Sequence, residues 1–141
     1  MALEGIAMMT EFELSITGSS KYLLDVVALL GEHGINIDTV ATARVGDRWV
    51  IKFLTGSEEE VRRTFIKANL DFKERKVLVI DIPNLPGEWV RTARALVDKK
   101  VDIDASYMLG QKDGKLRFVF GVNDPELAHK TAKLLPEVSV E

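Results

Sequence analysis

Two loops and two strand starts in this sequence carry the residue types that bind small charged molecules. Thr17–Lys21 and Pro83–Gly87 each stand directly before a predicted helix, while Asn36 and Asp102 each open a predicted strand. Free main-chain amides at a helix N-terminus attract a carboxylate group. A side-chain carboxylate or amide oxygen accepts hydrogen bonds from an ammonium group. Together these places suit a metabolite that carries both groups, which is the chemistry of an amino acid.

Each of these residues also has a purely structural interpretation. The Pro86-Gly87 step is typical of a tight turn between a strand and a helix, whatever binds there. Asn36 and Asp102 are equally compatible with polar edge-strand positions that face water. The Ser19-Ser20 step is favoured as a helix cap over a ligand contact, although a cap and an anion site can coincide.

Catalysis and metal binding have little support in the sequence. His33 and His129 lie in different halves of the chain and have no Asp or Glu partner at metal-ligand spacing. The segment Gly18-Ser19-Ser20-Lys21 lacks the upstream glycine of a phosphate-binding P-loop. We therefore predict no catalytic residue, no metal site and no cofactor, and a small enzyme is the weakest of the functional alternatives.

Composition predicts a globular protein. The chain has 141 residues, of which 46% are hydrophobic and 29% are charged. It has no cysteine, which excludes disulfides, thiol catalysis and cysteine zinc sites. No apolar run reaches the length of a membrane span, and residues 1–10 lack the basic start of a signal peptide. A cytoplasmic location without membrane association is the expectation.

Nucleic-acid binding is not expected. The net charge is −3, which argues against broad binding to a phosphate backbone. Leu116–Phe120 faintly resembles an RNA-recognition strand, but the expected glycines are missing and the partner strand at residues 77–82 has no aromatic residue. Core packing of Phe118 and Phe120 is expected instead. For Trp49 and Trp89 we expect ordinary partial burial, with an interface as the alternative.

An internal repeat organises the chain. Ile35–Asp38 aligns with Val101–Asp104 at a shift of 66 residues (102 − 36 = 66), and Leu30 aligns with Leu96 at the same shift. A period of this length suits a duplicated small domain rather than a solenoid. We predict a first unit over residues 1–76 and a second unit over residues 77–141.

Each copy is expected to fold in the order strand, helix, strand, strand, helix, strand. Ser57 followed by Glu60 predicts a capping box, and Asp124-Pro125 predicts the start of the last helix. The expected strands are residues 12–16, 35–44, 49–54 and 71–76 in the first copy, and 77–82, 101–109, 116–122 and 137–140 in the second. The pattern predicts an α+β fold with two ferredoxin-like βαββαβ units in tandem, each an antiparallel sheet with two helices on one face.

The loop and strand motifs also match a known pattern. Asn84-Leu85-Pro86-Gly87, the helix after it and Val101-Asp102-Ile103 follow one another in the second copy. This order closely resembles the ACT domain, which commonly shows an Asn-x-Pro-Gly loop, a helix, and Gly-Val/Ile-Asn-Ile entering the next strand. The first copy matches the later part as Gly34-Ile35-Asn36-Ile37, with Gly18-Ser19-Ser20-Lys21 in place of the proline loop. The whole chain looks like a free-standing tandem ACT protein.

This resemblance implies regulatory sensing of an amino acid or related metabolite at interfaces between paired units. Ligand contacts in the family come from the loop before the first helix of one unit and from the start of the second strand of another. The binding residues implied by position are Asn84, Leu85, Pro86, Gly87 and Asp102 in the second copy, and Gly18, Ser19, Ser20 and Asn36 in the first copy.

Self-association is predicted by the second strand of each copy, which lies at a sheet edge in a ferredoxin-like unit. Small or apolar residues follow that edge, namely Ala41, Ala43, Ala105 and Met108. An open edge of this kind invites pairing with another sheet. We expect a homodimer or a higher homo-oligomer, and a separate regulated partner protein is possible because the sequence contains no output domain. The alternative function is a ligand-free ferredoxin-like oligomerisation module.

Overall fold

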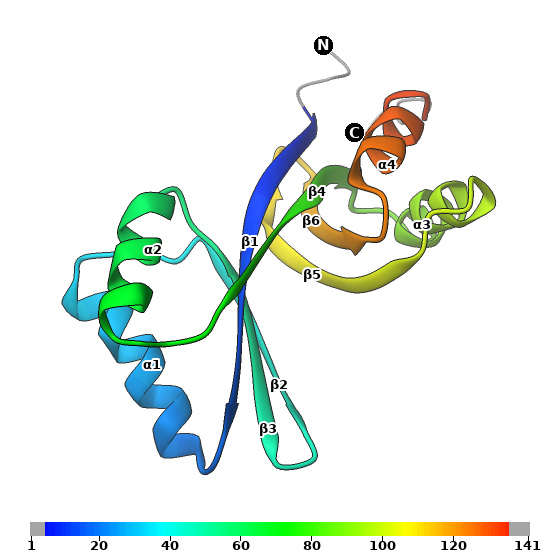
Figure 1. The fold of residues 1–141 in the computed structure, drawn as a ribbon. Coiled ribbons are helices and arrows are strands. Elements are labelled where there is room, and N and C mark those ends of the chain that lie inside the picture. Colours follow the sequence, from blue (N-terminus) through cyan, green and yellow to red (C-terminus); the bar gives the residue numbers. More distant parts are fainter. Residues whose placement is uncertain (1–4, 136–141) are drawn as a thin grey trace. The chain divides into compact units, whose positions relative to one another are not determined.

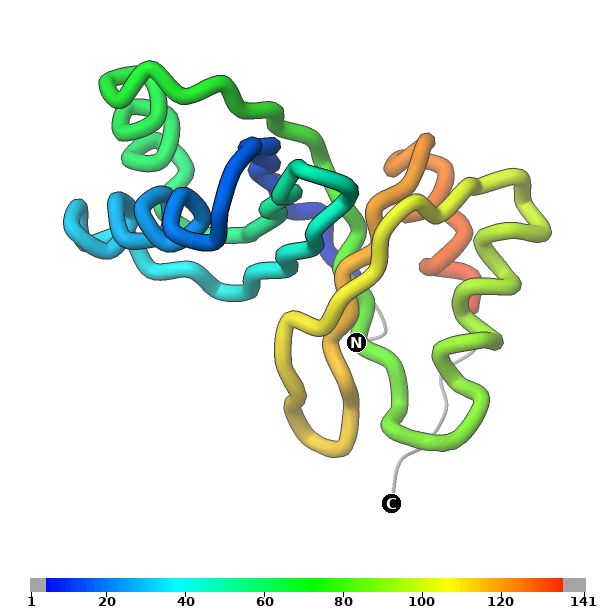
Figure 2. Tube along the Cα trace, turned by 90° about the horizontal axis from the view of Figure 1, so that it is seen from below, coloured from blue at the N-terminus to red at the C-terminus, as the bar shows by residue number. Residues whose placement is uncertain are grey.

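The computed structural model describes residues 5–135, which form six strands and four helices (Figure 1). The strands follow the hydrogen-bonded order β2-β3-β1-β4-β6-β5, which makes β2 and β5 the edge strands. The chain divides into two compact units. We call residues 10–75 the N-terminal unit, and residues 76–135 together with residues 5–9 the C-terminal unit (Figure 2).

The N-terminal unit places two helices on one face of its strands. Its elements are β1 (Ile6–Thr17, from residue 10 onward), α1 (Ser20–Glu32), β2 (Thr39–Val45), β3 (Arg48–Leu54), α2 (Glu58–Lys67) and the first residues of β4 (Lys73–Pro83). Alternate residues of β1 and β3 face the helices, so that Phe12 lies opposite Phe53 in the antiparallel ladder. The rings of these two residues stack at 5.5 Å, and Phe65 of α2 meets Phe53 edge to face at 6.0 Å. This aromatic cluster forms the centre of the core.

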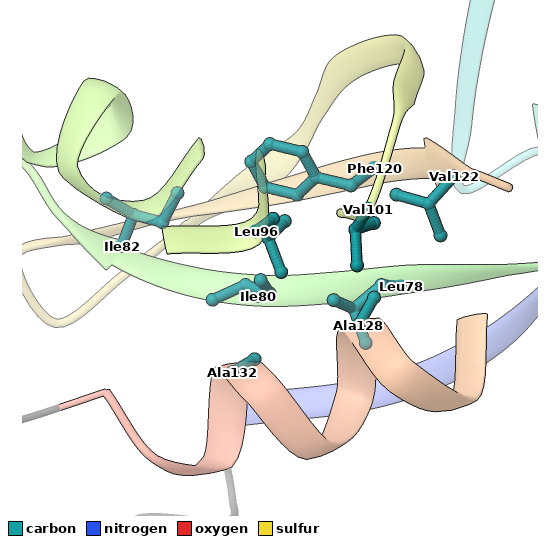
Figure 3. Packing of buried hydrophobic residues seen from close by; sticks show 9 residues of the cluster. All are labelled: Leu78, Ile80, Ile82, Leu96, Val101, Phe120, Val122, Ala128 and Ala132. Carbon is teal, nitrogen blue, oxygen red and sulfur yellow. The ribbon is translucent and has the colours of Figure 1, made fainter. Parts of the chain in front are cut away.

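The C-terminal unit repeats this plan. It contains the rest of β4, then α3 (Glu88–Asp98), β5 (Ile103–Lys112), β6 (Lys115–Val122) and α4 (Pro125–Lys133). Figure 3 shows Ala128 and Ala132 of α4 pointing toward Leu78 and Ile80 of β4. The small alanine side chains allow the helix to approach the sheet closely, while Phe120 fills the space beneath α3. The predicted α+β class with ferredoxin-like units is confirmed, and so is the predicted core position of Phe120.

Two strands extend farther than the alternation pattern predicts. The expected strands at residues 71–76 and 77–82 are one continuous strand, β4, and β1 begins at Ile6 rather than at Phe12. Twelve residues at about 3.3 Å each span roughly 40 Å, which is more than one small unit requires. The first part of β1 accordingly belongs to the C-terminal unit, where Ile6 packs on the core and Gly5 lies against Asp81. The structure thus assigns residues 5–9 differently from the predicted boundary. The expected strand at residues 137–140 lies outside the described residues.

Helix starts follow the predictions only in part. Asp124 caps α4, because its side chain accepts the main-chain N–H of Leu127 at 3.1 Å, and Pro125 is the first helical residue, as predicted. The predicted capping box at Ser57 is wrong, because the Ser57 side chain makes no cap bond. Its main-chain N–H instead donates to Oγ1 of Thr55 at 3.1 Å. Among the helices of the described residues, none is long and apolar enough to cross a bilayer.

Candidate functional site

The loop before α3 is held in place by its main chain. The N–H of Asn84 donates to the carbonyl of Gly114 in the β5–β6 turn at 3.0 Å, and the N–H of Leu85 donates to the carbonyl of Pro83 at 2.8 Å. Gly87 follows with φ +83°, a left-handed conformation that glycine adopts without strain. No side chain caps α3, and the side chain of Asn84 is exposed. The loop therefore presents a preformed helix start to solvent.

The loop before α1 has the same anchorage with different residues. The N–H of Gly18 donates to the carbonyl of Asp47 in the β2–β3 turn at 3.4 Å. Gly18 has φ +116°, a backbone conformation that favours glycine, and a Cβ at this position would lie 2.6 Å from the exposed Tyr22 ring, which would have to shift. Ser19 occupies the N-cap position of α1, but its side chain makes no cap bond, and Ser20 is exposed. Sequence reasoning did not foresee that each loop is tied to the hairpin turn of its own unit.

At the two strand starts, the main chain is held by hydrogen bonds to side chains of other residues. The carbonyl of Asn36 accepts a hydrogen bond from Oγ1 of Thr55 at 2.6 Å. The N–H of Asp102 donates to Oδ1 of Asn123 at 2.9 Å, and the N–H of Asn123 returns a bond to the carbonyl of Asp102 at 3.1 Å. The main chain is thus fixed, while the side chains of Asn36 and Asp102 remain exposed. These bonds also explain why β2 and β5 begin at Thr39 and Ile103, two to four residues later than predicted.

Within one unit, the helix-start loop and the strand start lie at opposite ends of the sheet. Pro83 pairs with Lys115 at the beginning of β6, whereas Ile103 pairs with Val122 at its end. Seven residue steps along β6 (122 − 115 = 7) correspond to roughly 23 Å. Asn84 and Asp102 of one unit therefore do not meet. The N-terminal unit repeats the separation, because Thr17 pairs with Arg48 and Thr39 pairs with Leu54.

Apolar residues surround the start of α3. The indole N–H of Trp89 donates to Oγ of Ser106 at 3.3 Å, and its ring stacks on Phe120 at 5.9 Å. Trp89 is 38% exposed, and Leu85 in the loop and Met108 on β5 are 43% and 48% exposed. An apolar ledge, formed by Trp89, Leu85 and Met108, therefore borders the first turn of α3. The periodicity of the chain assigned these residues to separate elements and so did not predict the ledge.

The N-terminal unit has a different aromatic residue near its loop. Trp49 pairs with Ile16 on β1 and with Arg44 on β2, and the Arg44 guanidinium lies 5.6 Å from the centroid of the Trp49 ring. The indole N–H of Trp49 is buried without a hydrogen-bond acceptor among residues 5–135. Trp49 is partly buried, as predicted, whereas Trp89 is exposed, which differs from the prediction. In the same part of the chain, no three His, Asp or Glu side chains gather as a metal site.

Comparisons with known proteins identify the fold. No protein-family model matches the chain, and no curated protein is similar to it in sequence. Among solved structures, a Bacteroides thetaiotaomicron protein superposes with a TM-score of 0.81 at 16% identity, over 92% of this chain and 89% of that one.

Two further solved structures are described as the regulatory subunit of aspartate kinase. The Thermus thermophilus subunit, in a ligand-free form, matches with a TM-score of 0.62 at 15% identity, over 91% of this chain and 94% of that one. The Thermus flavus subunit matches with a TM-score of 0.58 at 15% identity and the same coverage. At these identities, the chain is shown to share its α+β fold with regulatory subunits of aspartate kinase.

Proposed function

We propose that this chain is a regulatory protein of the ACT type that binds an amino acid or a related metabolite between units of different subunits. The observation that carries the proposal is the matched design of the two units. In each unit, a helix start without a side-chain cap is anchored by its main chain at one end of the sheet. At the other end of the sheet, the side chain of Asn36 or Asp102 is exposed, and the main chain of the same residue is held by a hydrogen bond. A complete site therefore requires two units.

Edge pairing between sheets supplies the required geometry. When two edge strands pair antiparallel, the start of one strand lies beside the end of the other. The end of β5 leads into the turn that holds Asn84, and the end of β2 leads into the turn that holds Gly18. Antiparallel pairing of two edges thus brings the strand start of one unit to the helix-start loop of another. This supports a site that forms only on association.

The chemistry of the two halves suits an amino acid. Main-chain amides at the start of α3 or α1 offer donors to a carboxylate, and the helix dipole adds a favourable field. The Asp102 carboxylate or the Asn36 amide oxygen accepts from an ammonium group. Beside α3, the partly exposed Trp89 and Met108 offer an apolar surface to a side chain. Leu85, Pro86 and Ser20 are the remaining residues of the two loops, although Pro86 has no N–H and the N–H of Leu85 already donates to the carbonyl of Pro83.

Ligand binding at an interface between two subunits would favour the associated state of the chain. The coupling free energy in comparable allosteric proteins is about 1–3 kcal/mol. The resemblance of the fold to proteins described as regulatory subunits of aspartate kinase supports a regulatory rather than a catalytic role. A separate protein would then recognise the associated state of this chain.

A thermal-shift screen of the twenty amino acids tests the proposal. Binding of one or two of them at a hundredfold excess over Kd stabilises the folded state by about 2.7 kcal/mol, which raises Tm by several degrees. Asn84→Ala and Asp102→Ala should abolish that shift while leaving the ligand-free Tm nearly unchanged. Asp71→Ala, an exposed carboxylate outside both places, is the matched control. If no amino acid raises Tm while the chain remains oligomeric, the ligand-free oligomerisation module replaces this proposal.

A further inference from the structure

Two strands carry the chain from one unit to the other. β1 passes from the C-terminal unit into the N-terminal unit at residues 9–10, and β4 passes back at residues 75–76. The two strands are hydrogen-bonded neighbours in the sheet (Figure 1). Each of them therefore belongs to both units, and residues 9–10 and 75–76 mark the boundary within the two strands.

A buried carboxylate lies directly beside this boundary. Glu11 of β1 is 1% exposed, and among residues 5–135 it is the only charged residue that is buried. Nε of Arg75 on β4 donates to Oε1 of Glu11 at 3.0 Å, and Nζ of Lys52 on β3 lies 3.9 Å from the same oxygen. Lys52 lies closer to Glu13, at 3.2 Å. Arg75, the last residue of the N-terminal unit, therefore makes a closer contact with Glu11 than Lys52 does.

Burial makes the stability of this place depend on Arg75. An ionised carboxylate that is removed from water requires a cation close to it, and loss of that cation leaves an uncompensated buried charge. Exposed ion pairs contribute less, because water solvates each partner when the other is removed. Loss of Arg75 should therefore destabilise the N-terminal unit more than loss of an arginine from an exposed pair.

The Glu11–Arg75 pair also fixes the register of β4. Successive side chains of a strand point to opposite faces, so a slip of one residue would place Glu74 or Lys76 where Arg75 stands. Glu74 has its own partner, because Nε of Arg62 on α2 donates to its Oε2 at 2.9 Å. Two successive residues of β4 are thus held from opposite sides directly before the boundary.

We propose that the Glu11–Arg75 pair couples the two units, so that they unfold in a single transition. While the pair is intact, β1 and β4 stay joined beside the boundary, and opening of either unit there breaks a buried ion pair. Without the pair, the boundary becomes a weak place in both strands, and each unit opens by itself. An amino acid that stabilises one unit would, through this coupling, stabilise the other, a consequence that rests on the proposed function.

Tryptophan fluorescence can follow each unit separately. The chain has two tryptophans, Trp49 on β3 in the N-terminal unit and Trp89 on α3 in the C-terminal unit. Two parent chains, Trp89→Phe and Trp49→Phe, each keep one of these reporters. In urea unfolding of each parent, the midpoint from fluorescence should coincide with the midpoint from circular dichroism, as a single transition requires. Midpoints that differ in either parent would overturn the proposal.

Arg75→Gln, introduced into both parents, should separate the midpoints. The Trp49 midpoint should fall by at least about 1 M urea, whereas the Trp89 midpoint should stay close to that of its parent. Arg75→Lys, which keeps a cation, should leave the midpoints coincident. Arg62→Gln is the matched control, because it removes an arginine from the exposed pair with Glu74 and leaves Glu11 paired, and its midpoints should also coincide. Coincident midpoints in folded Arg75→Gln would show that the strands are joined without the pair and would overturn the proposal.

Glu11→Gln keeps the test decisive if Arg75→Gln does not fold. This variant leaves no ionised carboxylate without a cation, and the amide oxygen of the glutamine still accepts from Arg75. Its midpoints should differ, because a neutral acceptor binds the guanidinium less strongly than a carboxylate does. Coincident midpoints in folded Glu11→Gln would then overturn the proposal. No ligand is present in these measurements, so their failure is distinguishable from failure of the amino-acid screen.

Discussion

Gly34 and Lys100, which lie 66 residues apart, hold the same left-handed backbone conformation, with φ values of +69° and +70°. Each follows the end of a helix, where the N–H of the next residue bonds back to the carbonyl of a buried leucine, from Ile35 to Leu30 and from Val101 to Leu96, both at 3.0 Å. Glycine adopts this conformation freely, whereas lysine is strained in it. The second copy therefore has backbone strain at Lys100, whereas the first copy avoids this strain because it has Gly34 at the equivalent position.

Lys100→Gly is expected to raise the free energy of unfolding by about 1 kcal/mol, because it removes the cost of a left-handed side-chain-bearing residue. Gly34→Ala is expected to lower it by a similar amount. Urea unfolding followed by circular dichroism measures both changes. A loss of stability in Lys100→Gly would mean that the lysine side chain contributes a contact that outweighs the strain.

Asp124→Ala is expected to cost about 1 kcal/mol, because it leaves the N–H of Leu127 without its cap. Ser57→Ala is the matched control, since the Ser57 side chain makes no cap bond at the equivalent helix. Its cost should stay within about 0.5 kcal/mol, the usual range of surface substitutions. Equal costs in thermal unfolding would contradict the capping difference.

Thr55→Val is expected to cost about 1–2 kcal/mol. Thr55 is 2% exposed, and its hydroxyl serves both the carbonyl of Asn36 and the N–H of Ser57. Loss of the hydroxyl leaves both groups unpaired. Thr92→Val is the control, because the buried Thr92 hydroxyl bonds only to the carbonyl of Glu88 on its own helix. Hydrogen exchange at residues 36–38 should rise in Thr55→Val alone, and unchanged exchange there would show that Thr55 does not hold the strand start.

Trp49→Phe is expected to lower Tm less than the burial of the Trp49 side chain alone would suggest. The substitution removes ring contacts but also removes a buried N–H without an acceptor, whose desolvation costs about 1–3 kcal/mol. Trp89→Phe removes an N–H that has a partner in Ser106 and loses part of the stack on Phe120. Trp89→Phe should therefore lower Tm at least as much as Trp49→Phe. The reverse order would indicate that Trp49 is hydrogen-bonded in solution.

The repeat and the alternation of apolar residues were sufficient to predict the order of elements and the class of fold. A residue such as Phe120 is buried because its strand alternates and its face is covered, and both conditions can be read locally. Turn signals were equally local: Asp113 and Gly114 have φ values of +54° and +76°, as a primed hairpin turn requires. The cap at Asp124 was likewise predictable from neighbouring residues in the sequence.

Strand length and site geometry depended on partners far away in the chain. The sequence cannot show that β4 continues through the predicted boundary, because a strand extends as far as neighbouring strands offer hydrogen bonds.

By itself, the sequence determined which donors, carboxylates and glycines the candidate site contains, since these are properties of residue type. Only the tertiary structure decided where they stand. A strand running through the whole unit separates Asn84 from Asp102 by the length of the sheet, so that the two can meet only across different units.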